Sequence, residues 1–473
     1  MPIIIPANSA ASGGFEVANS VRFNGGSNDH LKRTLGTATN VKKFTMSWWF
    51  KGTGIATGSM FEAASGNVQN GAFVYLKLDD ILIDSIVGNS ETMKLVPTAH
   101  YSDYAAWYHF CLAVDVTLGT AADRNKLYIN GERVTSFVTQ TNAGQNAARM
   151  FNTAIEHLIG IDVYNSGGSL ATPFNGYMSE FVFIDGSQED PTSFGEFDED
   201  SNIWKPIDVS SLTFGNNGFY LNFSNSGNLG EDFSGNDNDF TVVNLAATSQ
   251  TTDTCTNNFA TLNTLDDFYA SSTLSEGNLT LVGGGTNASM NATVGLDRGK
   301  WYWETRVNDW QGANNSAIGI SSEAATATNY EFYNQSGNNT GYGYYSNGSV
   351  YGNGGTPASG YGSASGTHII GVALDLDNNK IAWSYDGTFQ GSANPATGAN
   401  MIAITAPSSL LTGLYFPAFT QKSQTKTFNV NFGNPTFAIS SGNADDNNRG
   451  KFEYDVPAGF LSLCTANLSE ANS

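Results

Sequence analysis

Hydrophobic and polar side chains alternate along most of this chain, in short runs separated by polar turns. A period of two is the signature of a β-strand with one buried face. In FTMSWWF and YHFCLAVDV the apolar faces carry Phe44, Met46, Trp48 and Phe50, and Tyr108, Phe110, Leu112 and Val114. Asn130-Gly131 separates two further runs, which is a strong hairpin signal. No convincing amphipathic helix accompanies these runs, so the pattern predicts an all-β protein.

Two further segments show the alternation clearly. In GKWYWETRV, Trp301 and Trp303 share one face with Thr305 and Val307, and we expect both indoles to lie in a sandwich core. In GYMSEFVFIDG the same rule predicts two opposite sets, Tyr177, Ser179, Phe181 and Phe183 against Met178, Glu180, Val182 and Ile184.

Composition sets the number of domains and narrows the range of partners. A chain of 473 residues with 40% hydrophobic content is too long for one core and indicates two or three domains. The formal net charge of -22 argues against a nucleic-acid groove, which needs clustered Lys and Arg. The same charge argues against binding to an anionic membrane surface.

The three cysteines, Cys111, Cys255 and Cys464, lie far apart without a CxxC motif. Neither a zinc site nor a disulfide framework is therefore expected. The N-terminal MPIIIPANSAASGG has no basic region and no long apolar run, so it does not read as a secretory signal. No segment approaches the length of a membrane span, and we expect no membrane insertion. The chain is expected to fold in a reducing cytoplasm.

An ordered set of motifs in the first two hundred residues resembles a known family. SVRFNGGSNDHL, FTMSWWFKG, WYHFCLAVD, KLYINGERV, HLIGID and FNGYMSEFVFIDG occur in the order typical of laminin-G-like, concanavalin-A-type jelly rolls. The resemblance covers about residues 15–200 and implies a two-sheet sandwich.

Residues 201–268 are predicted to form a strand-bearing connector packed on this first sandwich. Their Gly/Asn/Asp run from Asp232 to Asp239 offers oxygen ligands that could coordinate a structural calcium ion. No other cofactor is predicted. The run lacks the closing glutamate of an EF-hand, and turn formation explains its composition more simply.

A second ordered set of motifs begins near residue 269. GKWYWETRV, AIGISS, GYGYYSNGSVYGNGG, HIIGVALDLDNNKIAWSYDGT, LYFPAF and NVNFGN follow one another as in a SPRY domain, another bent two-sheet sandwich. The resemblance covers residues 269–435 and leaves 436–473 as a C-terminal extension. Within it Asp375, Asp377 and Asn379 are spaced like a metal triad, but the resemblance places them in a tight turn. The fold predicted for the whole chain is all-β, with two jelly-roll-type β-sandwich domains and a β-containing connector.

The tandem of the two modules resembles structural proteins of tailed bacteriophages, especially aquatic ones. That resemblance implies a virion protein on a fibre, an appendage or the head, which folds in the host cytoplasm before release. It implies partners among portal, tail or capsid subunits and host-surface glycans, and a homo-oligomer, a trimer for a fibre. We expect residues 1–14 to be an anchoring peptide, because chain termini are ordered mainly when tied down.

An enzymatic role is the alternative to this binding role. Laminarinase-class glycosidases carry E-x-D-x-x-E on one strand, and Glu196 and Asp198 in GEFDEDSN match only its first two acids, since Ser201 replaces the third. Metalloprotease, nucleophile-elbow and phosphate-loop motifs are absent, and the five histidines are scattered. The expectation is a protein without catalytic residues.

Aromatic residues between positions 310 and 361 favour binding instead. They are spaced by Gly, Asn and Ser, and flat rings flanked by amides and hydroxyls suit sugars or adaptable protein contacts. The residues predicted to be exposed for ligand binding are Trp310, Tyr330, Tyr333, Tyr345 and Tyr351. Two alternatives remain open: a capsid decoration protein without a receptor role, and a glycoside hydrolase-like enzyme.

Overall fold

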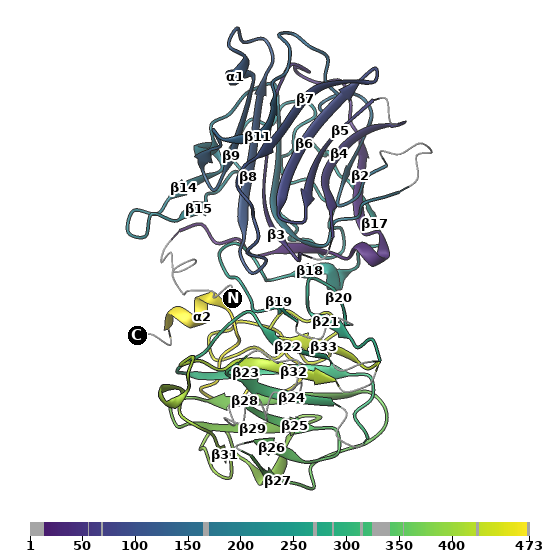
Figure 1. The fold of residues 1–473 in the computed structure, drawn as a ribbon. Helices are drawn as coiled ribbons and strands as arrows, with labels where there is room; N and C mark the ends of the chain where they lie inside the picture. The colour runs from purple at the N-terminus through teal and green to yellow at the C-terminus, as the bar shows by residue number, and fades with distance from the viewer. Residues whose placement is uncertain are drawn as a thin grey trace. The chain divides into compact units, whose positions relative to one another are not determined.

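The structure is a computed structural model that describes residues 14–54, 56–67, 70–163, 170–267, 272–285, 288–312, 316–323, 341–352, 354–421 and 425–470. Strands dominate, and the two α-helices of the described residues are short, α1 (Ala121–Arg124) and α2 (Thr465–Glu470) (Figure 1). The predicted all-β class is confirmed. Within the described part of the chain, no helix has the length and apolar character that a membrane crossing requires. The chain divides between Asn257 and Asn258 into two compact units, called here the first and the second unit.

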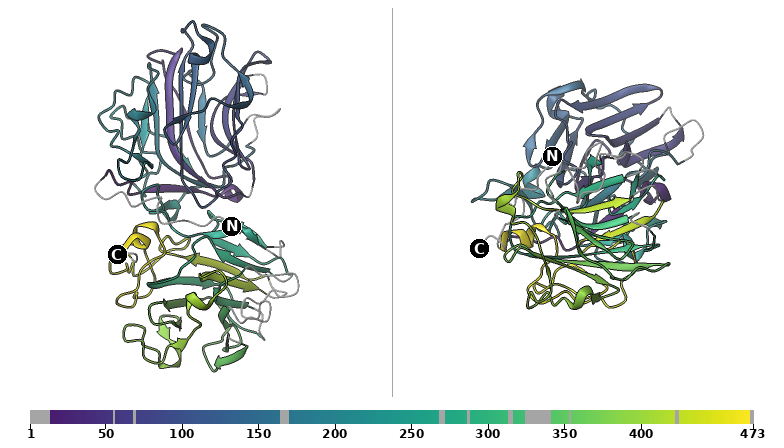
Figure 2. Two further views of the ribbon diagram at one scale, coloured as in Figure 1. Left: turned by 60° about the vertical axis from the view of Figure 1, so that its left-hand side comes forward. Right: turned by 60° about the horizontal axis from the view of Figure 1, so that its bottom comes forward.

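Two antiparallel sheets form the sandwich of the first unit, and a third pairing covers part of it (Figures 1 and 2). The first sheet has the order β10 (Glu132–Arg133), β9 (Asn125–Ile129), β8 (Tyr108–Asp115), β3 (Lys43–Gly52), β13 (Gly176–Asp185), β1 (Ser20–Phe23), β18 (Gln250–Thr251), with β16 (Phe219–Leu221) paired to β13. The second has the order β11 (Phe137–Thr141), β7 (Ser90–Pro97), β6 (Asp80–Val87), β5 (Asn70–Lys77), β4 (Gly58–Asn67), β12 (Glu156–Ile159), β2 (His30–Thr34), β17 (Thr241–Val243). The third pairing joins β14 (Gly195–Phe197) and β15 (Trp204–Pro206).

The core of the first unit lies between its two sheets. The predicted inner residues Phe44, Met46, Trp48 and Phe50 of β3 all lie in it, as do Phe110, Leu112 and Val114 of β8. Trp48 stacks between Phe110 and Phe181, with ring centroids 4.3 and 4.6 Å away. These aromatic layers confirm the face that the alternation predicts for both central strands.

The predicted faces of GYMSEFVFIDG are wrong for half of the strand. Met178, Phe181 and Phe183 point into the core, whereas Val182 and Ile184 pack on the opposite face. The pairing of β13 with β3 shifts between Ser179 and Val182, which is a β-bulge. An extra residue at a bulge reverses the side-chain alternation beyond it, so the set containing Tyr177 and Phe181 is split between the two faces.

The second unit is another sandwich of two antiparallel sheets. One has the order β19 (Leu262–Asp267), β22 (Ala288–Ala292), β32 (Phe416–Gln421), β24 (Ser316–Ser321), β25 (Gly341–Tyr345), β26 (Val350–Gly352), β27 (Gly355–Ala358). The other has the order β20 (Thr273–Ser275), β21 (Thr280–Val282), β33 (Thr427–Asn431), β23 (Lys300–Val307), β28 (His368–Asp375), β29 (Lys380–Tyr385), β30 (Thr388–Phe389), with β31 (Ile402–Ala403) paired to β29. Trp301 and Trp303 lie in the core between these sheets, as predicted.

The segment after β33 covers the outer face of β23 and its neighbours. Tyr302 of β23 packs there with Phe452 and Phe460 of the covering segment. Glu304, two residues along the same face, is fully buried, and its carboxylate accepts the backbone N–H groups of Glu453 and Tyr454, both at 2.9 Å. The Tyr302 hydroxyl donates to the same carboxylate at 3.1 Å.

The start and the end of the second unit lie side by side. The Thr465 N–H donates to the Asn258 carbonyl at 2.9 Å, and the Ala260 N–H donates to the Leu463 carbonyl at 3.0 Å. Residues 258–260 and 463–465 therefore close this unit with an extended backbone pairing.

We expect Glu304→Ala to release the covering segment, because the two N–H groups and the Tyr302 hydroxyl would lose their buried acceptor. Leaving such donors unsatisfied costs roughly 2–4 kcal/mol of unfolding free energy. Hydrogen-exchange mass spectrometry of peptides spanning 443–461 measures the loss of protection. Asp455→Ala, at an exposed position of the same segment, is the control. Unchanged protection in Glu304→Ala would show that apolar packing alone holds the segment.

Candidate functional site

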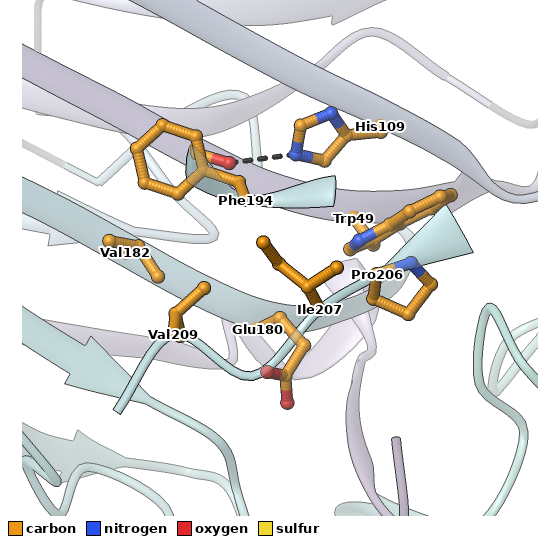
Figure 3. A pocket seen from close by; sticks show the side chains of 9 residues that line it. Trp49, His109, Glu180, Val182, Phe194, Pro206, Ile207 and Val209 are labelled. Atoms are coloured by element: carbon orange, nitrogen blue, oxygen red, sulfur yellow. Dashed lines mark hydrogen bonds between the residues drawn. The ribbon is translucent and has the colours of Figure 1, made fainter. Parts of the chain in front are cut away.

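The candidate site is a small pocket on the outer face of the first unit's β8–β3–β13 strands (Figure 3). The strands contribute five side chains, and a covering segment that includes β15 contributes four. The lining residues are Ser47, Trp49, His109, Glu180 and Val182 from the strands, and Phe194, Pro206, Ile207 and Val209 from the cover. The space is about 200 Å³ including its opening to solvent, and its closed part has room for about one water molecule.

A serine–histidine pair forms one wall of this pocket. The Ser47 hydroxyl lies 2.8 Å from His109 Nε2, drawn as the dashed line in Figure 3. Burial lowers the pKa of His109 to about 3, so the imidazole is neutral at physiological pH. A neutral imidazole next to a hydroxyl is the start of a nucleophile–base arrangement.

The remaining parts of a hydrolytic triad are missing here. Among the described residues, His109 Nδ1 is buried and meets no hydrogen-bond partner, so no acid orients the ring. The Glu180 carboxylate points away from the imidazole in Figure 3. Together with a space that admits about one water, this arrangement suits a structural cavity, since pockets for small molecules usually measure about 300–1,000 Å³.

Glu180 is the most unusual side chain of the pocket. It lies in the β13 bulge with a backbone φ of 50°, a left-handed conformation that residues other than glycine rarely adopt. Only 7% of it is exposed, and the Tyr220 hydroxyl donates to its Oε2 at 2.5 Å. Burial raises the pKa of Glu180 to about 7. The site therefore holds a carboxyl group that changes protonation near neutral pH.

Sequence reasoning missed this pocket. Ser47 and His109 are ordinary polar positions in two alternating strands, and nothing local marks their contact. Glu180 had a weak signal: Ser179 and Glu180 are two consecutive polar residues within an otherwise apolar run. Such a pair is what a bulge can place on one face.

Two of the five predicted ligand-binding residues are not exposed, which corrects that prediction. Trp310 and Tyr345 are both 0% exposed. Trp310 packs edge-on against Tyr344 at 5.1 Å in the core, and Tyr345 packs with Ala317 and Ala418 on the opposite face of β25. Tyr345 has no exposed side because β25 is buried on both faces, and Trp310, outside the named strands, lies in the core between the sheets.

Tyr351 is half-buried, and Asn347 Nδ2 donates to its hydroxyl at 3.2 Å. Its ring contacts that of Tyr345 at 5.0 Å, so these two predicted residues are neighbours. Tyr330 and Tyr333 lie outside the described residues. Ligand binding by this group stays a prediction.

The carboxylates of the two candidate metal-binding segments accept hydrogen bonds typical of turns. Asp232 accepts the backbone N–H groups of Tyr220, Ser234 and Asn238. Asp375 accepts from the Asn378 backbone and side chain, and Asp377 accepts the Gly299 N–H at 2.7 Å.

A different cluster has the spacing that a metal ion needs. Asp79, Asp80 and His100 bring one ligand atom each within 4.8 Å of one another. His100 Nδ1 lies 2.8 Å from Asp80 Oδ1, and its side chain is 64% exposed. Exposed ion pairs of this kind are common on protein surfaces without a metal.

The two acids of GEFDEDSN serve the β14–β15 hairpin. Lys205 Nζ lies 3.4 Å from Glu196 and 3.2 Å from Asp198. Hydrogen bonds from the Ser201 backbone and hydroxyl, with that from Lys205, lower the pKa of Asp198 to about 2. A group that stays ionised down to this pH is unsuited to donate a proton to a leaving sugar.

Comparisons with known proteins agree with the predicted content of the second unit. The family model of the SPRY domain matches residues 300–435. A search of curated proteins found no match.

Among solved structures, the SPRY domain of human HERC1 is 14% identical, with 36% of this chain and 96% of that chain covered and a TM-score of 0.27. Domains LG4-5 of the mouse laminin alpha1 chain are 12% identical, with 95% and 88% covered and a TM-score of 0.31. A heptameric SAP-like pentraxin from Limulus polyphemus is 18% identical, with 43% and 95% covered and a TM-score of 0.28. Similarities at this level carry no information about ligand or partner.

The raised pKa of Glu180 predicts that the first unit loses stability as the pH rises. Below about pH 4.5, the ordinary value, the carboxyl is protonated in both the folded and the unfolded chain. Between pH 4.5 and the folded pKa of about 7 only the unfolded chain releases the proton, so the unfolding free energy falls by about 3 kcal/mol.

Glu180→Gln keeps an acceptor for Tyr220 but carries no charge, and we expect it to flatten this dependence. Exchange protection of β13 peptides, compared at pH 5 and pH 8 after correction for intrinsic exchange, measures the effect. Glu196→Gln, on an exposed side chain, should retain the wild-type slope. Equal slopes for wild type and Glu180→Gln would contradict the assignment.

Proposed function

We propose that this chain is a non-enzymatic structural protein of a tailed-phage virion. In this proposal it is a fibre or appendage subunit on the particle surface, and it binds host-surface glycans or neighbouring virion subunits. It would fold in the host cytoplasm, join portal, tail or capsid subunits and act as a homo-oligomer, a trimer if it forms a fibre.

The small volume of the pocket and the ion pairs of the two candidate acids support binding over catalysis. The pocket lined by Ser47, His109 and Glu180 has room for about one water. The acids that match part of a glycosidase motif are held by Lys205 in a hairpin. A glycosidase needs two carboxyl groups facing one another across a sugar, and a binding module does not.

The composition supports a surface location on a large assembly. A net charge of -22 disfavours nucleic acid and favours solubility at high local protein density. The SPRY match over residues 300–435 is consistent with a binding role. Calcium bound to such a protein remains a proposal as well.

A second candidate function is a capsid decoration protein without a receptor role. The burial of Trp310 and Tyr345 favours it, because it removes two of the five aromatic rings expected to face a ligand. Under this alternative the remaining tyrosines would contact neighbouring subunits rather than glycans.

A glycan array distinguishes these two candidates. If the protein is a receptor-binding subunit, the wild type retains at least one glycan class, and Tyr330→Ala/Tyr333→Ala/Tyr351→Ala weakens retention about tenfold, because aromatic contacts contribute roughly 1 kcal/mol or more. Leu411→Ala, at a side chain that is 89% exposed, should bind like wild type. No glycan retained by the wild type would favour decoration. Equal retention by the triple variant would move the site away from these tyrosines.

A further inference from the structure

A lysine and an aspartate are fully buried against each other in the first unit. Lys51 Nζ lies 2.9 Å from Asp253 Oδ2, and the two side chains are 1% and 0% exposed. Lys51 is near the end of β3, and Asp253 follows β18, so the contact joins positions 202 residues apart in the chain. Neither residue belongs to the pocket or to the predicted ligand surface.

The surroundings hold the carboxyl group in one orientation. The Trp107 indole N–H donates to the other oxygen, Asp253 Oδ1, at 3.0 Å. The Ser20 hydroxyl donates to the Asp253 backbone carbonyl at 2.5 Å, which fixes the main chain at this point. The Tyr177 ring centroid lies 5.4 Å from Lys51 Nζ, and the ring of Trp107 packs on that of Tyr177. The two aromatic rings help to keep water from the contact.

At such a site a buried ammonium–carboxylate pair can convert into a neutral amine and a neutral carboxylic acid. Taking an ammonium and a carboxylate out of water is costly, and one proton transfer along the Nζ–Oδ2 contact converts them into an amine and a carboxylic acid. The amine is then a nucleophile in contact with an electrophilic carboxyl group. Strand β3 holds Lys51, and the buried chain after β18 holds Asp253 against it, which removes the entropic barrier of a reaction between separate molecules.

We propose that Lys51 and Asp253 condense to an intramolecular isopeptide bond. The Nζ lone pair attacks Asp253 Cγ, and the electron pair of the carbonyl moves to Oδ1, where the Trp107 N–H stabilises it. The C–O bond to Oδ2 then breaks, Oδ2 leaves with two protons from the nitrogen as one water, and the carbonyl at Oδ1 re-forms. Ammonium and carboxylate thus become a neutral amide and water, with no oxidant or other reactant.

The same unit contains a matched ion pair that lacks these conditions. Lys43 Nζ lies 2.9 Å from Asp115 Oδ2, but the lysine side chain is 35% exposed. Asp115 is engaged by the Thr117 backbone and hydroxyl rather than by an indole. Water reaches this pair, so it is expected to remain ionic.

The bond would give the first unit a covalent closure that its cysteines do not provide. Cys111, Cys255 and Cys464 are all free thiols in the structure. A link between residues 51 and 253 would close a loop containing most of the unit, and long closed loops restrict the unfolded chain most strongly.

Intact mass spectrometry of the denatured, purified full chain tests the proposal without any variant. The expected mass is lower than the sequence mass by one water, and a proteolytic digest should contain a branched peptide that joins Lys51 to Asp253. Lys51→Met and Asp253→Ala should each show their full sequence mass whether or not they fold. Lys43→Met should still lose one water.

A wild-type mass equal to the sequence mass would overturn the proposal and leave a buried ion pair. A water lost without the branched peptide would overturn it too, because succinimide formation elsewhere gives the same mass change. Persistence of the water loss in Lys51→Met would have the same consequence.

Discussion

In each unit, a segment of irregular chain covers the outer face of one sheet, and the burial of that face depends on it. Irregular backbone carries N–H groups that no neighbouring strand can accept, and burying them unpaired would cancel the gain from packing. In the second unit the Glu304 carboxylate accepts two such N–H groups from the covering segment. In the first unit Asp253, in the chain after β18, accepts the ammonium of Lys51 on β3 and the indole N–H of Trp107. A buried acid thus joins irregular chain to a sheet in both units.

In the first unit this construction buries Ser47, His109 and Glu180. The pocket under the first unit's cover contains a serine, a histidine and an acid, but the cover leaves room for about one water. The acids that a glycosidase would need are used for turns and for ion pairs with Lys205. In the second unit the cover reaches beyond residues 300–435, the part that matches the SPRY domain, and its chain end pairs with the start of the unit. Recognition is therefore expected to use outer surfaces and loops.

Alternation along the sequence was sufficient to predict the strands and the core of each sandwich. Trp301, Trp303 and the inner residues of β3 lie where a period of two places them, because each of these strands has one face on the core. The same rule failed across the bulge at Glu180, which puts Met178 in the core and Val182 on the opposite face although both belong to one predicted set. It also failed for Tyr345, because the side chains of β25 are buried on both of its faces. Pairs such as Ser47 with His109 and Lys51 with Asp253 arise from strand register and covering segments, which local pattern does not encode.

We propose that this protein belongs to the surface of a tailed-phage virion. Antibody–gold labelling of intact, purified particles of the source phage tests that claim most directly. The account predicts gold on the particle surface; labelling at distal tail appendages would support host recognition, and labelling over the capsid would support decoration. Particles that carry no label, while the antibody detects the protein in infected cells, would contradict the account.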